Sequence, residues 1–517
     1  MRTADSETDS KGEKMETMLK RGAGILMPVF SLPSPYGIGT FGRDARDFID
    51  QLKKARQSFW QVLPMGPTSY GDSPYQSFSA FAGNPYFIDL DTLREEELLT
   101  QEELDECFWS EQPDQVKYDA VYYYRFPLLK KAFGRSRHGE TEEYKAFLKK
   151  NAYWIDDYSL YMALKKHFED AGWLEWDEDV RFRRPAAMEK YKEELKEEID
   201  YWKFLQFKFF EQWENLKKYA NENNIRIVGD IPIYVALDSA DVWSHPEQFQ
   251  LDEENLTPVS VAGVPPDAFS DEGQLWGNPL YRWDYMEKTD FAWWRERMRA
   301  SAGLYDVIRI DHFLGVVQYY SIAYGAENAK AGEWKTGPGK KLTDAIDESV
   351  GETKIIAEDL GIFCQGVKDL LKETGYPGMK IIEFAFSGDR FNEHLPHCYE
   401  PNMVVYGGTH DNETLAGYFK ADKREWWELQ YIADYLGAAH QNEVVDRVFR
   451  AAYGSVASVA IFQMQDVLRL DNSARLNTPG TVGENWRWRL KKGQFTEEHT
   501  SYLAWLVDIF GRFQEGR

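Results

Sequence analysis

The chain has 517 residues, of which 43% are hydrophobic and 28% charged, a composition typical of a globular protein rather than a disordered one. Its length fits about three domains, or one large barrel that carries insertions. The formal net charge of −25 argues against nucleic acid and anionic membranes as partners, because their phosphates would repel it. We therefore expect any polymer substrate to be uncharged.

The beginning of the chain and its cysteines indicate a cellular compartment. Residues 1–20 are polar and lack the apolar stretch of a signal peptide, so they are predicted to form a disordered tail. Cys107, Cys364 and Cys398 are too few and too scattered for a disulfide framework. No run approaches the ~20 apolar residues that span a bilayer. We expect a cytoplasmic protein without a membrane partner.

Short apolar runs alternate with helical patterns from residue 21 onward, which is typical of a parallel α/β sheet. Several of these runs are rich in Ile and Val, as strands buried on both faces are. In chain order, the predicted strands are residues 25–30, 59–64, 226–235, 307–313, 354–360, 379–386, 404–410 and 457–463. Eight such strands with helices between them predict one catalytic α/β domain, a closed (β/α)8 TIM barrel over residues 21–517.

Two connections are longer than a barrel requires. Residues 69–224 are strongly charged and helical in pattern, which predicts a mainly helical inserted subdomain. Residues 240–289 are rich in Pro and Gly, which predicts a loop-rich insertion. Because insertions that follow a barrel strand lie at the C-terminal face, we expect both to wall the active site.

Three short motifs fail on their context. The G-x-G-x-x-G run at residues 37–42 neither follows a strand directly nor has the acidic residue that dinucleotide binding requires. A run that begins like a phosphate-binding loop has Pro338 where lysine must stand. His394, His397 and Cys398 have no further clustered ligands, so a surface loop is the favoured interpretation. The sequence predicts neither a cofactor nor a metal.

Acidic side chains stand at or just after the ends of three predicted strands. They are Asp311, near Arg309; Glu358; and Asp411, next to His410. One such acid alone would most simply be a capping or ion-paired residue, but three that converge on one barrel face favour catalysis. Three carboxylates without a metal or nucleotide motif fit glycoside cleavage. One attacks the anomeric carbon, a second protonates the leaving oxygen, and a third holds ring hydroxyls.

Seven motifs in a fixed order extend this interpretation. They are SLPSPYGIG from Ser31, LPMGPTSYGDSPY from Leu63, GDIPIY from Gly229, QLWGNP from Gln274, RIDHF from Arg309, AEDLG from Ala357 and GTHDN from Gly408. Together they resemble the amylomaltase family, the 4-alpha-glucanotransferases of glycoside hydrolase family 77. The resemblance extends from about residue 21 to about residue 490, without an added N-terminal starch-binding module.

The resemblance implies an activity. Such an enzyme cleaves an α-1,4 bond of a maltooligosaccharide or amylose and transfers the glucanosyl unit to the 4-OH of an acceptor glucan or glucose. It does so by a retaining double displacement, without a cofactor, as a monomer or weak homo-oligomer. Asp311 matches the family's nucleophile, Glu358 its general acid/base and Asp411 its third carboxylate.

The resemblance also implies a set of substrate-binding residues, with Pro479 and Trp486 close to the cleft. The set comprises Tyr75, Asp230, Asp267, Gln274, Trp276, Asn278, Arg309, His312, His410 and Asn477. One departure is Leu314, where the family often has arginine. Two alternatives stay open, an α-glucan hydrolase with the same carboxylates and a non-catalytic glucan-binding protein. Water exclusion, which separates the first alternative from a transferase, depends on loop closure rather than on residue type.

Overall fold

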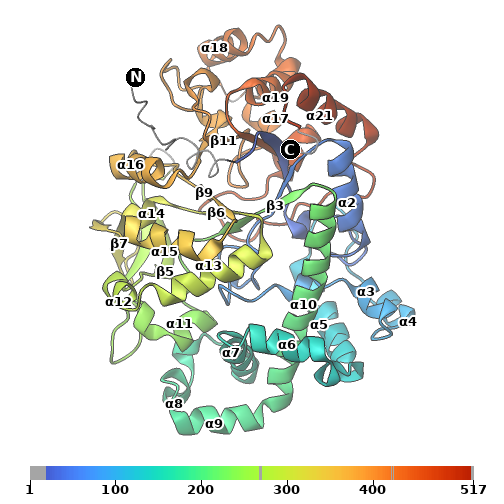
Figure 1. Ribbon diagram of the computed structural model, residues 1–517, viewed down its shortest axis with the longest axis vertical. Coiled ribbons are helices and arrows are strands. Elements are labelled where there is room, and N and C mark those ends of the chain that lie inside the picture. The colour runs from blue at the N-terminus through green and yellow to red at the C-terminus, as the bar shows by residue number, and fades with distance from the viewer. Residues whose placement is uncertain (1–18, 267–269, 421, 423, 514–517) are drawn as a thin grey trace, which may run out of the picture.

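The computed structural model describes residues 19–266, 270–420, 422 and 424–513 (Figure 1). Residues 1–18 of the predicted tail lie outside the described residues, and Leu19 is buried. The main sheet has eight parallel strands in the order β10-β11-β12-β1-β2-β3-β6-β9. Its strands are β1 (Gly22–Leu26), β2 (Phe59–Gln61), β3 (Arg226–Ile231), β6 (Val307–Ile310), β9 (Lys354–Ala357), β10 (Gly378–Ile381), β11 (Met403–Tyr406) and β12 (Val459–Gln463).

The two edge strands of this sheet meet and complete the barrel. The amide of Ala357, at the end of β9, donates to the carbonyl of Pro377, just before β10, at 3.0 Å. The predicted (β/α)8 barrel is therefore confirmed, and each predicted strand overlaps an observed one. β1 begins earlier than predicted, at Gly22, Ala23 and Gly24. The small size of these residues lets the strand lie close to β2. A Cβ at Gly24 would lie 2.7 Å from Cβ of Phe59.

Helices connect the strands and surround the sheet. They are α2 (Arg43–Lys54), α3 (Leu90–Glu95), α4 (Gln101–Asp105), α5 (Tyr118–Arg135), α6 (Glu142–Lys150), α7 (Ile155–His167), α8 (Glu178–Arg181), α9 (Pro185–Glu194), α10 (Lys196–Glu222), α11 (Ala240–Ser244), α12 (Trp283–Lys288), α13 (Ala292–Leu304), α14 (Leu314–Val317), α15 (Lys340–Val350), α16 (Gln365–Thr374), α17 (Leu415–Tyr418), α18 (Trp426–Leu436), α19 (Val444–Gly454), α20 (Met464–Val467) and α21 (Glu497–Ile509). Around the barrel, α2 contacts both α21 and α10, and α13 contacts both α10 and α15. Within the described residues, no helix is long and apolar enough to cross a membrane.

The long connection between β2 and β3 forms a helical layer beside the barrel. Figure 1 shows α5 to α9 gathered at the lower end of the molecule, with α10 running from them up to the barrel. The C-terminal half of α10 packs on the barrel, where Nε1 of Trp213 donates to the carbonyl of Leu304 at 3.1 Å. One helix thus serves both as the barrel crossover and as part of the helical layer.

The segment 240–289 was expected to be rich in loops, but it contains two strands. β4 (Ser260–Val264) and β5 (Gln274–Pro279) join β7 (Gln318–Ala323) and β8 (Glu333–Thr336) in an antiparallel sheet of order β5-β4-β7-β8. Pro265, Pro266 and Gly273 lie between β4 and β5, whereas Gly277 and Pro279 lie within β5 itself. β4 and β5 precede β6 in the chain, whereas β7 and β8 follow it, so no local sequence pattern could reveal this pairing.

Candidate active site

The polar residues at the carboxyl ends of the strands lie together at one mouth of the barrel. Asp230 lies within β3, Arg309 within β6, and Asp311 directly follows β6. Glu358 directly follows β9, and Asp411 follows β11 after a short turn. Parallel barrel strands end on the same face, so residues far apart in the chain become neighbours there.

Arg309 joins two carboxylates into one buried ion network. Its Nη1 atom lies 2.7 Å from both carboxylate oxygens of Asp230 and 2.9 Å from Oδ1 of Asp311. Burial by itself would lower the pKa of the Arg309 guanidinium, but the charges of Asp230 and Asp311 outweigh it and raise that pKa. Asp230 is 0% exposed, so its carboxylate is enclosed by the protein. Asp311 is 29% exposed and reaches the cleft.

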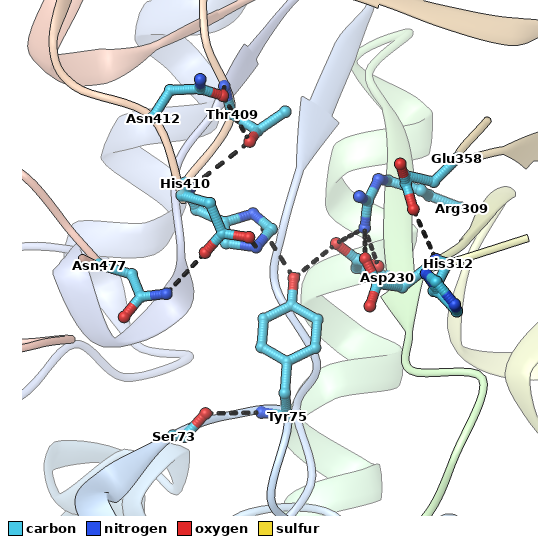
Figure 2. Close-up of polar contacts among 12 residues, drawn as sticks. Ser73, Tyr75, Asp230, Arg309, His312, Glu358, Thr409, His410, Asn412 and Asn477 are labelled. Carbon is cyan, nitrogen blue, oxygen red and sulfur yellow. Dashed lines mark hydrogen bonds and ion pairs between the residues drawn. The ribbon is translucent and has the colours of Figure 1, made fainter. Parts of the chain in front are cut away.

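Tyr75 connects this network to the residues that follow β11. Its hydroxyl donates to Oδ2 of Asp230 at 2.9 Å and lies 3.5 Å from Nδ1 of His410. The Tyr75 and His410 rings are stacked, with centroids 5.0 Å apart. Figure 2 shows the Tyr75 ring standing between the Asp230 and Arg309 side of the site and the His410 side. The aromatic side chain therefore fixes the spacing of the two halves of the site.

Glu358 has the environment of a carboxylic acid that keeps its proton near neutral pH. It is 8% exposed, and its two oxygens accept hydrogen bonds from the amides of His312 at 2.7 Å and Leu360 at 2.9 Å. Burial and the charge of Asp311 raise the pKa of Glu358 to about 8, against the opposing effect of Arg309 and the two amides. His312 is next to Asp311 in the chain, and this bond places Glu358 beside the Asp311 carboxylate.

Asp411 lies on the opposite side of the cleft and is held by the 475–477 segment. Asn477 Nδ2 donates to Oδ1 of Asp411 at 2.6 Å, and Arg475 Nη2 donates to its backbone carbonyl at 2.5 Å. His410 Nε2 lies 3.5 Å from Oδ2 of Asp411. The Asp411 side chain is exposed to the cleft, and its neighbour His410 is buried.

The cleft between these groups has a volume of about 370 Å³. Trp276, on β5, meets the His312 ring edge to face at 4.8 Å, and its Nε1 atom donates to Gln274 at 3.1 Å. Burial lowers the pKa of His312 to about 4, so this imidazole is neutral at pH 7. The cleft is lined by Gly71, Ser73, Tyr75, Gln76, Pro232, Ile233, Tyr234, Gln274, Trp276, Asn278, Asp311, His312, His410, Asp411, Asn477, Pro479, Gly480, Thr481, Val482, Asn485 and Trp486. Aromatic faces with a few carboxylates and amides suit a saccharide ligand.

The structure thus brings together nearly all of the predicted site residues that it describes. Asp267 lies outside the described residues. Asn278 lies on β5 rather than on a loop, and its Nδ2 atom donates to the carbonyl of Val235 at 2.8 Å. Sequence reasoning did not single out Tyr234 or Asn485, which also line the cleft. Tyr234 ends the motif GDIPIY, which could have pointed to it.

This arrangement can perform acid and nucleophile chemistry on one bond. A carboxylate paired with arginine and a buried acid of raised pKa beside it suit the nucleophile and the proton donor of a retaining cleavage. Among the described residues, no group of three or more His, Cys, Asp or Glu side chains is arranged to hold a metal ion.

Comparison with known proteins decides the family. A sequence profile described as 4-alpha-glucanotransferase matches residues 27–496. The chain belongs to the 4-alpha-glucanotransferase family. It is 49% identical to the 4-alpha-glucanotransferase of Clostridium butyricum over 94% of this chain and 100% of that one. It is 45% identical to that of Streptococcus pneumoniae over 96% of this chain and 99% of that one.

A solved structure agrees with this membership. The chain superimposes on an amylomaltase from Streptococcus agalactiae in complex with acarbose with a TM-score of 0.92 and 40% identity, over 96% of this chain and 100% of that one. This protein is therefore an enzyme, a 4-alpha-glucanotransferase built on a (β/α)8 barrel.

Proposed function

We propose that this 4-alpha-glucanotransferase cleaves and transfers α-1,4-glucan chains by double displacement, with Asp311 as nucleophile and Glu358 as general acid/base. In the first step, Asp311 attacks the anomeric carbon while Glu358 gives its proton to the departing glycosidic oxygen. The single observation that carries this assignment is the buried carboxyl group of Glu358, whose raised pKa of about 8 keeps it protonated at neutral pH and able to donate that proton. Arg309, whose Nη1 atom lies 2.9 Å from Oδ1 of Asp311, orients the nucleophile.

The second step reverses the roles. Glu358, now ionised, removes the proton from the 4-OH of an acceptor, whose oxygen displaces Asp311 from the anomeric carbon. Asp411 faces the cleft and is oriented by Asn477, so it can hold ring hydroxyls as positive charge develops on the sugar. Tyr75, Gln274, Trp276, His312 and His410 are assigned to substrate contact, and Asp230 to support of Arg309.

The donors and acceptors assigned here are maltooligosaccharides and amylose, with glucose as a further acceptor. The aromatic-lined cleft, in which the acids Asp311 and Asp411 would repel an anion, and the net charge of −25 support a neutral glucan over an anionic polymer. We also assign the protein to the cytoplasm, as a monomer or weak homo-oligomer. Its three scattered cysteines, all free thiols, support a reducing compartment.

Incubation with maltotriose tests the transfer reaction against hydrolysis and against simple binding. Transfer yields a ladder of shorter and longer oligosaccharides, because each cleaved unit is added to another chain. Glucose and maltose alone would contradict the proposal in favour of hydrolysis, and unchanged maltotriose would contradict it in favour of binding. Chromatography at matched substrate consumption distinguishes the three outcomes.

A further inference from the structure

Two buried acids that take no part in these steps lie behind the segment that carries Asp411. Glu383 lies in the turn η7 (Ile382–Phe384) after β10, and Asp466 lies in α20 after β12. β11 runs between β10 and β12, so the two acids stand on either side of the segment that follows it. Glu383 is 3% exposed and Asp466 is 0% exposed.

Both acids are in direct contact with the 407–415 segment. The amide of Leu415 donates to Oδ1 of Asp466 at 2.7 Å, and the amide of Glu383 donates to the carbonyl of Gly407 at 3.2 Å. The Glu383 carboxyl packs on the backbone of Gly408, where a Cβ would lie 2.7 Å from Oε1. The segment is thus fastened near both of its ends.

Hydrogen bonds within and beside the segment make it a fixed turn. Oδ1 of Asn412 accepts from both the amide and the hydroxyl of Thr409 at 2.9 Å, a pair drawn in Figure 2. Oδ1 of Asn472 accepts from the amide of Thr414 at 3.1 Å. A shift of Glu383 or Asp466 is therefore transmitted to Asp411, which lies between these anchors.

We propose that Glu383 and Asp466 are positioning residues, which hold the 407–415 segment so that Asp411 meets the sugar ring at the transition state. This inference rests on the function proposed above, in which Asp411 contributes most when charge develops on the sugar, so its placement bears on kcat more than on substrate binding. Neither acid reaches the cleft itself.

The surroundings of the two acids favour their neutral forms. Oε1 of Glu383 and Oδ2 of Asp466 are buried and accept no hydrogen bond from any residue that the structure describes. Burial and the charges of Asp466 and Glu413 raise the pKa of Glu383, against the opposing charge of Arg475 and a side-chain hydrogen bond with Asn412. Burial raises the pKa of Asp466 to about 7, against the Leu415 amide and the charge of Arg469. An ionised carboxylate would be costly at either place.

The neutral form makes the experiment specific. An amide of the same shape should replace each acid, whereas alanine should not. The test compares kcat and KM on maltotriose at pH 6 for four variants, Glu383→Gln, Glu383→Ala, Asp466→Asn and Asp466→Ala. The amide variants are expected to keep kcat within about twofold, because they keep the shape and the neutral charge. The alanine variants should lose on the order of 10²-fold in kcat with little change in KM, as a misplaced catalytic group does.

A matched control and a structural measurement separate positioning from loss of stability. Asp347→Asn alters another acid of raised pKa, which accepts from the Tyr376 hydroxyl at 2.5 Å, outside the cleft, and it should leave kcat unchanged. Hydrogen exchange of the Leu415 amide should be faster in Asp466→Ala than in the parent. Folded alanine variants with parental kcat, or amide variants as inactive as alanine variants, would overturn the proposal.

If an alanine variant does not fold, the amide variants still decide the question. Cleavage of a maltosyl fluoride donor does not need a protonated Glu358. The decrease of kcat for this donor at alkaline pH therefore reports the ionisation of other groups. That fall should move to higher pH in Glu383→Gln and Asp466→Asn. An unmoved profile in both variants would contradict the proposal.

Discussion

Among the single residues of the site, the carboxyl groups of Asp311 and Glu358 lie at the same mouth of the barrel but in different surroundings. Asp311 lies 2.9 Å from the Arg309 guanidinium and faces the cleft. Glu358 is buried, and its pKa is raised to about 8. Such a contrast between neighbouring acids supports the proposed roles of nucleophile for Asp311 and proton donor for Glu358.

The first prediction separates these two roles. Asp311→Ala and Glu358→Gln should both fold and both lose several orders of magnitude in transfer from maltotriose. On a glucosyl fluoride, whose leaving group needs little protonation, glycosylation should survive in Glu358→Gln and fail in Asp311→Ala. Fluoride release measures that step directly, and equal loss of it in both variants would contradict the assignment.

The second prediction concerns the stability that is lost by keeping Glu358 protonated. The pKa of this group is about 8 in the folded protein and about 4.3 in the unfolded chain. Stability therefore falls as pH rises from about 4 to about 8, because the folded state must hold a proton that the unfolded state has released. Glu358→Gln should remove this fall and raise the free energy of unfolding by about 3 kcal/mol at pH 7.

Urea unfolding at pH 4 and pH 7 measures this effect. The stabilisation by Glu358→Gln should be present at pH 7 and nearly absent at pH 4, where both states of the parent are protonated. Equal stabilisation at the two pH values would show that the gain comes from packing and not from the proton.

At the scale of elements, the antiparallel sheet supplies one wall of the cleft. β5 carries Gln274, Trp276 and Asn278, and all three line the cleft. A glucosyl-enzyme exposed to water would be hydrolysed. Transfer therefore requires that an acceptor sugar binds against this wall before water attacks the intermediate. A flat indole face is suited to bind that sugar.

The third prediction follows from this wall. Trp276→Ala should raise the ratio of hydrolysis to transfer while cleavage at Asp311 continues. The measurement compares glucose release with oligosaccharide growth from maltotriose at equal substrate consumption. Trp334→Ala is the matched control, because Trp334 lies on β8 of the same sheet, packs on Tyr320 and is outside the cleft. An unchanged ratio in Trp276→Ala would remove this residue from acceptor selection.

At the scale of the whole molecule, two arginines fasten the two ends of the described chain to each other. Arg512 donates to the carbonyl of Gly22, in β1, at 2.9 Å and to that of Ala457, just before β12, at 3.1 Å. Arg21 donates to the same carbonyl of Ala457 at 3.1 Å and to that of Phe510 at 3.2 Å. The contact of β1 with β12 is thus reinforced by residues from both ends.

The fourth prediction tests this closure. Arg512→Met should lower the free energy of unfolding by about 3 kcal/mol, because buried carbonyls lose a charged donor. Arg447→Met is the control, since Arg447 on α19 makes, within the part of the chain that the structure describes, only an exposed ion pair with Glu443 at 3.6 Å. Urea unfolding of the two variants measures the difference, and equal stabilities would show that the guanidinium contributes nothing to closure.

Apolar runs in the sequence predict the barrel and its eight strands, because parallel strands buried on both faces are apolar along their length. The three acids stand out as ionisable residues beside these runs. The sequence could not reveal the sheet formed by β4, β5, β7 and β8, whose pairing joins segments on either side of β6.

The charge state of Glu358 and the contacts that hold the 407–415 segment depend on the tertiary structure. The pKa of Glu358 is raised above that of an ordinary glutamate by burial and by the nearby Asp311. Glu383 and Asp466 become neighbours of the 407–415 segment only when β10, β11 and β12 align. The physical reason is that burial and electrostatic coupling depend on distances in space, which residue order does not contain.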